Sequence, residues 1–206
     1  MSYLLHGSTS HTGMGWVDRI PRAGNLFIGG LYALYQTDLI KAANITHIVS
    51  VVDYEPGLES KEHLKECKKL HIWAEDDPNE DLLKSFEKTS EFITDGLREN
   101  TKGESGGVFV HCAMGKSRSA AVVVAWLMKE YELGWEEALR QVEEGRPVCD
   151  PNPGFKEQLA VWGKMLREND GTRRQALYEE WAKSRFKGSS WEWEKRIESE
   201  KTKARL

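Results

Sequence analysis

A cysteine and an arginine, Cys112 and Arg118, stand at the two ends of a short polar stretch between two apolar runs. The first run, residues 108–110, is typical of a buried strand, and the second, from Ala120, repeats apolar residues at spacings of three and four, as in a buried helix. A loop that leads into a helix N-terminus presents backbone N–H groups and a positive dipole end, which together bind anions. The pattern predicts an oxyanion site with a thiol beside it.

We expect Cys112 to act as a nucleophile, because thiols beside a helix N-terminus and a fixed cation ionise more readily than free cysteine. The planar guanidinium of Arg118 can hold two phosphate oxygens and stabilise the charge of a pentavalent transition state. Ser119 follows directly, where its hydroxyl can hydrogen-bond the sulfur and help it leave. A buried structural cysteine beside a capping loop is the alternative, but it does not explain Cys, Gly and Arg in this order. The phosphate-binding residues are predicted to be Ala113, Met114, Gly115, Lys116, Ser117 and Arg118.

Phosphoryl transfer from an alcohol or a phenol also needs a proton for the leaving oxygen. An acidic loop supplies five candidate carboxyl groups, namely Glu75, Asp76, Asp77, Glu80 and Asp81. The spacing alone does not choose between Asp76 and Asp77, and Pro78 stiffens the loop in either case. Taken alone, such a cluster is more often a solvated loop with a helix cap, here at Asp81.

The sequence from His111 to Ser119, HCAMGKSRS, resembles the signature loop of the cysteine-dependent phosphatases, and its wording is similar to the dual-specificity branch. The resemblance covers about residues 20 to 166 and includes the segments LFIGGLYAL, ITHIVSVV, SRSAAVVVAWLM and RPVCDPNPGFKEQL. It implies that Asp76 is the general acid, because this family places the acid five residues before a second Asp that opens a helix. It also implies that His111 and Asn152 support the phosphate loop, Asn152 by packing behind the loop and hydrogen-bonding it.

The resemblance implies a protein phosphatase that uses no metal and no other cofactor and acts on phosphoproteins. A shallow pocket, open to phosphoserine and phosphothreonine as well as phosphotyrosine, is expected from it. Lys116 leaves open an inositol phosphate or lipid substrate, since extra positive charge suits multiply phosphorylated ligands. A further alternative is a binding module whose catalysis is dispensable.

The elements that must position these residues alternate along the chain. Strands are expected at residues 26–28, 45–52, 69–74 and 108–110, and helices at 32–43, from 81 to about 97, from 120 to about 128, 135–144 and 155–167. Alternation of strands and helices indicates parallel pairing with right-handed crossovers. We therefore predict an α/β fold, with a central, mostly parallel sheet flanked by helices and a C-terminal helical tail. This is the fold that the dual-specificity resemblance implies.

Length and composition set the remaining expectations. The 206 residues suit a flexible lead-in at 1–18, a phosphatase domain at 19–170 and a basic, aromatic tail at 171–206. The net charge of −4 lacks the basic excess of a dedicated nucleic-acid binder, so direct binding of nucleic acid is not expected. The sequence has no long apolar stretch and no signal-peptide pattern, so neither a membrane span nor secretion is expected. Three cysteines without a CxxC spacing predict no zinc and a reducing compartment, the cytoplasm, the nucleus or both.

The tail, residues 172–206, carries ten Lys and Arg against six Asp and Glu, and it has four large aromatic residues: Trp181, Phe186, Trp191 and Trp193. We favour a helical appendage that packs these rings on the domain over a surface that docks a partner or a ribonucleoprotein. The segment ALYEEWAKSRF resembles the exit from the phosphatase domain in a fungal and animal subfamily that carries a C-terminal zinc domain and acts in 60S ribosomal subunit maturation. This resemblance implies contact with a pre-60S particle. The Cys-rich domain is not part of this sequence, so the chain is either a piece of such a protein or a shorter relative. In the first case, the ribosomal role would reside largely outside the chain.

Overall fold

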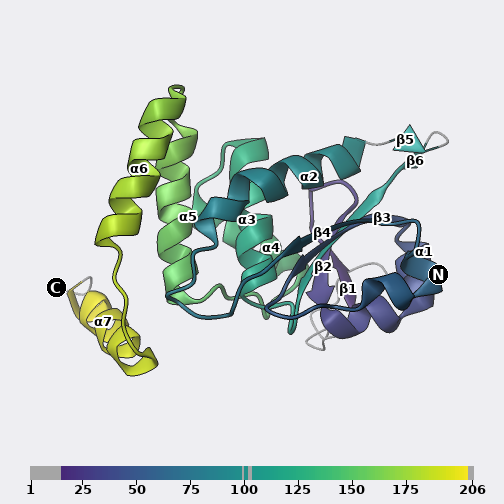
Figure 1. The fold of residues 1–206 in the computed structure, drawn as a ribbon, viewed down its shortest axis with the longest axis horizontal. Coiled ribbons are helices and arrows are strands. Elements are labelled where there is room, and N and C mark those ends of the chain that lie inside the picture. The colour runs from purple at the N-terminus through teal and green to yellow at the C-terminus, as the bar shows by residue number, and fades with distance from the viewer. Residues whose placement is uncertain (1–14, 99, 102–103, 204–206) are drawn as a thin grey trace.

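A five-stranded sheet forms the centre of the molecule in the computed structural model, which describes residues 15–98, 100–101 and 104–203 (Figure 1). The strand order is β1-β2-β7-β3-β4, and only the edge pair of β1 and β2 is antiparallel within this sheet. The bounds are β1 Val17–Arg19, β2 Leu26–Gly30, β3 Ile45–Val51, β4 Lys68–Ile72 and β7 Gly107–Cys112. The predicted α/β fold with a mostly parallel sheet is confirmed.

Helices cover both faces of the sheet, so the central strands are buried on both sides. One face packs against α2 Phe86–Arg98, α3 Arg118–Tyr131, α4 Trp135–Gly145 and α5 Pro153–Leu166. The other packs against a 3-10 turn at Leu31–Tyr35, α1 Thr37–Ala42 and short turns at Leu58–Ser60 and Glu62–Leu64. In β7, Val108 and Val110 join the first cluster and Phe109 the second, as the strand period of two requires. The apolar run before Cys112 thus reflects burial on two faces.

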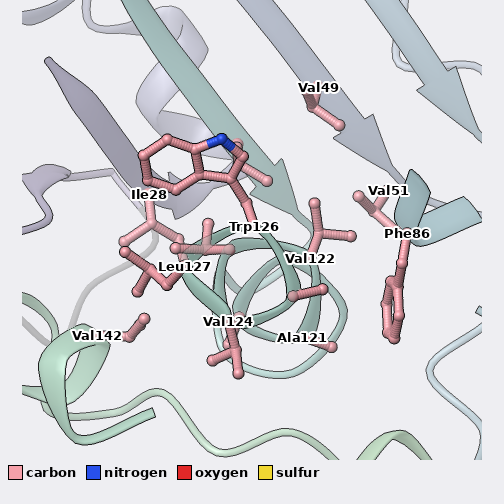
Figure 2. Packing of buried hydrophobic residues seen from close by; sticks show 14 of the residues in the cluster. Ile28, Val49, Val51, Phe86, Ala121, Val122, Val124, Trp126, Leu127 and Val142 are labelled. Carbon is pink, nitrogen blue, oxygen red and sulfur yellow. The ribbon is translucent and has the colours of Figure 1, made fainter. Parts of the chain in front are cut away.

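Helix α3 is buried along most of its length, because the strands lie on one side of it and neighbouring helices on the other. Figure 2 shows Trp126 and Val122 on the side that faces the strands and Val124 on the opposite side. Every residue from Arg118 to Met128 is buried. This packing fixes the N-terminus of α3, and with it the position of the predicted phosphate loop.

Two expected helices differ in their bounds. The helix expected at 32–43 is divided, because Gln36, with φ −89° and ψ 76°, is not helical between the 3-10 turn and α1. The helix expected from Asp81 begins at Phe86, after a 3-10 turn at Leu83–Ser85. The backbone N–H groups of Leu82 and Leu83 both donate to the side chain of Gln158 at 2.8 Å. A side chain from α5 therefore holds the segment that was expected to be the first helical turn.

The N-terminal segment, the loop before β7 and the C-terminal tail complete the chain around the central elements. The lead-in was expected to run to residue 18, but Val17 and Asp18 lie in β1 and are buried, and residues 1–14 lie outside the described part. The polar loop before β7 contains a short antiparallel pair, β5 Asn100–Thr101 and β6 Glu104–Ser105. The tail forms two helices, α6 Gly171–Ser184 and α7 Ser190–Lys203, as expected of a helical tail. Within the described residues, no helix is long and apolar enough to span a membrane.

Candidate active site

The turn from β7 into α3 places the predicted nucleophile at the carboxyl edge of the sheet. Cys112 is the last residue of β7, only 1% of its surface is exposed, and Arg118 is the first residue of α3. The Cys112 sulfur accepts a hydrogen bond from the Gly115 N–H at 3.2 Å and lies 3.3 Å from the Ser119 hydroxyl oxygen. The sulfur therefore lies within hydrogen-bonding distance of two groups that can donate to it.

Gly115 has a backbone conformation that the loop depends on. Its φ is +68°, in the left-handed region that side chains other than glycine rarely adopt. A Cβ atom at this position would lie 2.2 Å from the carbonyl carbon of Gly29 in β2. The loop therefore turns directly against the neighbouring strand, and glycine is the residue that fits there.

The guanidinium of Arg118 is buried and points along the same edge of the sheet. Its Nη1 donates to Asp53 Oδ1 at 3.0 Å and to the Ala74 carbonyl at 2.9 Å. Within the part of the chain that the structure describes, the Nε–H has no hydrogen-bond partner, and the Asp76 carboxylate lies 4.0 Å from it. A buried donor without a protein partner at a candidate site is suited to a ligand oxygen.

The carboxyl group of Asp76 contacts the phosphate loop. Its Oδ1 accepts from the Ser117 hydroxyl at 2.6 Å and from the Asn152 side-chain amide at 3.0 Å. The Asn152 backbone N–H donates to the same hydroxyl, and its side-chain oxygen caps α5 at the Phe155 N–H, both at 3.0 Å. Asp77 instead accepts from the Asn79 N–H at 2.7 Å and caps a turn. The structure thus brings Asp76, rather than its rival, to the loop.

His111 supports the end of β7 from within the core. Its Nε2 lies 2.7 Å from the Ser50 hydroxyl and its Nδ1 lies 3.3 Å from the Cys112 carbonyl oxygen. Complete burial lowers the pKa of His111 to about 4, so the imidazole is neutral at physiological pH. Its contacts therefore concern the backbone beside the nucleophile and not the sulfur.

Arg146 was given no role from the sequence, yet it binds the back of the phosphate loop. It is fully buried, and it donates to the carbonyl oxygens of Gly115 at 2.7 Å and Met114 at 3.0 Å. Its Nη1 also pairs with Asp18 of β1 at 2.5 Å. Two carbonyl groups of the loop are thereby turned toward Arg146, which leaves the loop's concave side to its N–H groups.

The chain matches the model of a known protein family. The model for the catalytic domain of dual specificity phosphatases matches residues 26–165, a span that includes Asp76 and the whole Cys112 loop. The chain belongs to the dual specificity phosphatase family. It is thus a member of the cysteine-based protein phosphatases.

Individual relatives agree with this assignment. Dual specificity protein phosphatase 22-B of Danio rerio is 34% identical over 180 residues, which cover 87% of this chain and 88% of the relative. A Dictyostelium discoideum protein named a probable dual specificity protein phosphatase is 36% identical, and the match spans 69% of this chain but only 34% of that protein.

Solved structures share the fold of this chain. The Yvh1 phosphatase domain from Chaetomium thermophilum is 35% identical with a TM-score of 0.68 and covers 75% of this chain and 99% of that one. Human DUSP28 is 32% identical with a TM-score of 0.65, and covers 74% and 95% respectively.

The remaining residues of the predicted phosphatase loop lie as follows. The Ala113 carbonyl accepts from Leu31 N–H at 3.1 Å, and the Lys116 carbonyl accepts from Asp150 N–H at 2.8 Å. The side chains of Met114 and Lys116 are exposed. Over the described ranges, no group of three or more His, Cys, Asp or Glu is arranged to hold a metal ion.

Four residues beside the phosphatase loop were missed by sequence reasoning, for different reasons. Asp53 directly follows the buried run of β3, and its place at the carboxyl edge of a parallel sheet was a usable signal. The next residue, Tyr54, also lies near Arg118: partial burial raises the pKa of its phenol, while the Arg118 charge acts in the opposite direction. Arg146 follows a helix and Asp18 falls in the expected lead-in, so neither position had a local signal.

Proposed function

We propose that this chain is a dual-specificity protein phosphatase that hydrolyses phosphotyrosine and phosphoserine or phosphothreonine through a cysteinyl phosphate. The observation that carries the proposal is the convergence on one loop of the buried Cys112 thiol, the Arg118 guanidinium and the Asp76 carboxyl group. These groups supply a nucleophile, a binder of phosphate oxygens and a proton donor. Each is needed for transfer of a phosphoryl group from an oxygen leaving group.

In the first step, the Cys112 thiolate attacks phosphorus and a sulfur–phosphorus bond forms. The bond from phosphorus to the substrate oxygen breaks, its electron pair goes to that oxygen, and Asp76 delivers the proton. Arg118 and the backbone N–H groups of the loop hold the equatorial oxygens, where charge stabilisation contributes most. The bonds from Ser117 and Asn152 fix the Asp76 carboxyl group for this transfer.

In the second step, a water molecule attacks phosphorus while the Asp76 carboxylate takes its proton. The sulfur–phosphorus bond breaks and its electron pair returns to sulfur, which gives inorganic phosphate and the free thiolate. The Ser119 hydroxyl, 3.3 Å from the sulfur, stabilises the departing charge with a hydrogen bond. The cycle ends with Asp76 protonated and Cys112 ionised, ready for another substrate.

The test is hydrolysis of a small aryl phosphate in reducing buffer with a chelator, for the wild type and for Cys112→Ser. We expect turnover from the wild type and none above background from the variant. Measurable turnover by Cys112→Ser would overturn the covalent route. Asp76→Ala should lower the rate mainly for substrates with poor leaving groups, by about 10²- to 10⁴-fold. The same loss in Asp77→Ala instead would move the general acid by one residue.

Substrate class is tested separately from catalysis. Phosphate release from peptides that carry phosphotyrosine, phosphoserine or phosphothreonine is compared with release from inositol phosphates. The exposed Lys116 is the feature that would favour a multiply phosphorylated small molecule. Preference for peptides, unchanged in Lys116→Ala, supports the protein phosphatase. Preference for inositol phosphates that Lys116→Ala removes would replace it.

We further propose that the protein takes part in maturation of the 60S ribosomal subunit, and that it acts in the cytoplasm, the nucleus or both. Its support is the tail segment's resemblance together with the likeness to the Yvh1 phosphatase domain. The experiment is restoration of ribosome maturation in cells that lack the protein. Rescue by Cys112→Ser as complete as by the wild type would favour a binding module over a catalyst. Failure of both chains to restore maturation would contradict the ribosomal role.

A further inference from the structure

The C-terminal helices α6 and α7 lie beyond the residues that the family model matches, yet they contact the loop that carries Asp76. Figure 1 shows α6 beside α5, and the chain then turns into α7 near the N-terminal end of α5. The connection between α6 and α7 includes Gly188, which meets Asn79, three residues after Asp76. The tail is therefore adjacent to the general-acid loop.

Asn79 is bound by the tail through its entire side-chain amide. Its Oδ1 accepts from the Gly188 N–H at 3.0 Å and from the Trp193 indole N–H at 3.1 Å, and its Nδ2 donates to the Gly188 carbonyl at 2.9 Å. The Asn79 backbone N–H meanwhile donates to Asp77. One residue thus joins the turn next to Asp76 with the connection between the two tail helices.

The tail side of this contact is itself well anchored. Trp193 is only 3% exposed, and its ring packs edge-on against Phe186 with centroids 4.9 Å apart. Arg196, one turn further along α7, pairs with Glu157 of α5 at 2.7 Å. Because the indole is buried and packed against Phe186, its hydrogen bond to Asn79 has a fixed direction.

A second tail contact restrains the other end of the same loop. The Tyr178 hydroxyl of α6 donates to Asp81 Oδ2 at 2.7 Å. The domain restrains the same stretch: Gln158 binds the Glu80 carbonyl and the backbone N–H groups of Leu82 and Leu83. Asn152 binds the Asp76 side chain. In the stretch between Asp76 and Asp81, the tail thus supplies three hydrogen bonds of the Asn79 side chain and one of the Asp81 side chain, whose Oδ1 accepts from the Lys84 N–H at 3.3 Å.

We propose that the C-terminal helices position the general acid, with Trp193 and Gly188 acting through Asn79 to hold the Asp76 loop against the phosphate loop. The inference rests on the proposed function, in which Asp76 donates the proton. Asn79, Gly188 and Trp193 act through the loop that carries Asp76, so they are positioning residues. Their effect is confined to the proton transfers of Asp76, of which kcat/KM reports the first.

The experiment measures kcat/KM for aryl phosphates that span good to poor leaving groups, in the full chain. Asn79→Ala and Trp193→Phe remove hydrogen bonds of the contact, and Trp193→Phe keeps an aromatic ring for packing. Trp191→Ala is the matched control, because Trp191 lies on the same helix but is 60% exposed. Circular dichroism and the thermal midpoint show whether each variant is folded.

We expect Trp193→Phe, which removes one uncharged hydrogen bond, to lower kcat/KM about three- to tenfold for the poorest leaving group. Asn79→Ala, which removes three, should lower it at least as much. With the best leaving group and in Trp191→Ala the rate should stay near that of the wild type. In an Asp76→Ala background, the contact substitutions should cost nothing further, since the acid that they position is gone. A purely structural role would lower the rate equally for all leaving groups and in both backgrounds.

The outcomes separate the two proposals. A wild type without turnover, or a Cys112→Ser variant with turnover, contradicts the proposed function itself. An active wild type whose Asn79→Ala and Trp193→Phe variants, where folded, show the wild-type dependence on leaving group overturns the positioning role alone. If both contact variants fail to fold, the tail is a structural part of the domain and the positioning role is likewise rejected.

Discussion

Replacement of Arg146 by alanine should destabilise the protein more than any change at an exposed ion pair. Arg146 is fully buried, and its loss would remove the guanidinium that pairs with the buried carboxylate of Asp18. Removal of one partner from a buried pair costs about 3–5 kcal/mol. Because domains of this size have unfolding free energies of about 5–15 kcal/mol, the variant should remain folded but with a clearly lower urea midpoint.

The matched control is Arg22→Ala. Arg22 forms two hydrogen bonds with Glu144, at 2.8 and 3.0 Å, but both side chains are more than half exposed. Water screens such a pair and hydrates the partner that remains, so the urea midpoint should stay almost unchanged. Both variants are measured by urea denaturation, followed by tryptophan fluorescence, with the slope of the transition compared. Equal midpoints for the two variants would refute the assignment of a buried, structural role to Arg146.

The same substitution should also affect catalysis. Without Arg146, the carbonyl groups of Met114 and Gly115 lose their donors and can turn toward the phosphate site, where their dipoles repel the oxygens. A lysine supplies the charge but not the three directed N–H groups, so Arg146→Lys should restore stability better than turnover. Full turnover in Arg146→Lys would show that charge alone organises the loop.

Two further predictions concern residues beside Cys112. Because burial lowers the pKa of His111 to about 4, the unfolded chain binds a proton at this site between about pH 6.5 and 4 and the native one does not. The contribution of neutral His111 to the free energy of unfolding is present above about pH 6.5 and is lost as the pH falls toward 4. Between pH 7 and pH 5, urea denaturation should show a loss of about 2 kcal/mol. This loss should be absent in His111→Gln. Ser119→Ala should lower kcat by about 10- to 100-fold, because a hydrogen bond to a charged group contributes about 1.5–3 kcal/mol, and should leave kcat/KM nearly unchanged. Stopped-flow measurements should then show a burst of released alcohol, and equal losses in both constants without a burst would contradict a role in the second step.

Most of the fold followed from periodicity in the sequence. The buried strands and α3 were predictable because burial on both faces of a sheet demands continuous apolar residues, and a buried helix demands the 3.6-residue period. The bounds at Asp81 were wrong because Gln158, distant in sequence, satisfies the N–H groups at Leu82 and Leu83. Asp81 does accept from the Lys84 N–H at 3.3 Å, as expected of a cap, but the turn that it caps is 3-10 and the α-helix begins only at Phe86.

The candidate site was predictable to the extent that its chemistry is local. Cys112, Gly115 and Arg118 lie within seven residues, so their spacing alone indicated an anion loop. The choice of Asp76 over Asp77 depended on a resemblance, since adjacent carboxyl groups are equivalent until the turn that Asp77 caps is known. The hydrogen bond between Arg146 and Gly115 joins residues that are 31 positions apart in the sequence. No pattern of residue types predicts such a contact.

The phosphate loop has two sides, and the two are completed by different parts of the chain. The signature residues supply the concave side, whereas the outer side depends on Arg146, whose charge is balanced by Asp18. Asp18 precedes the family match at residue 26, and the tail contact at Asn79 comes from helices that follow its end at residue 165. A chain trimmed to the matched residues would keep the nucleophile and the acid but would leave Arg146 without its carboxylate and Asn79 without its partners. The physical unit that supports this site is therefore larger than the sequence unit that identifies it.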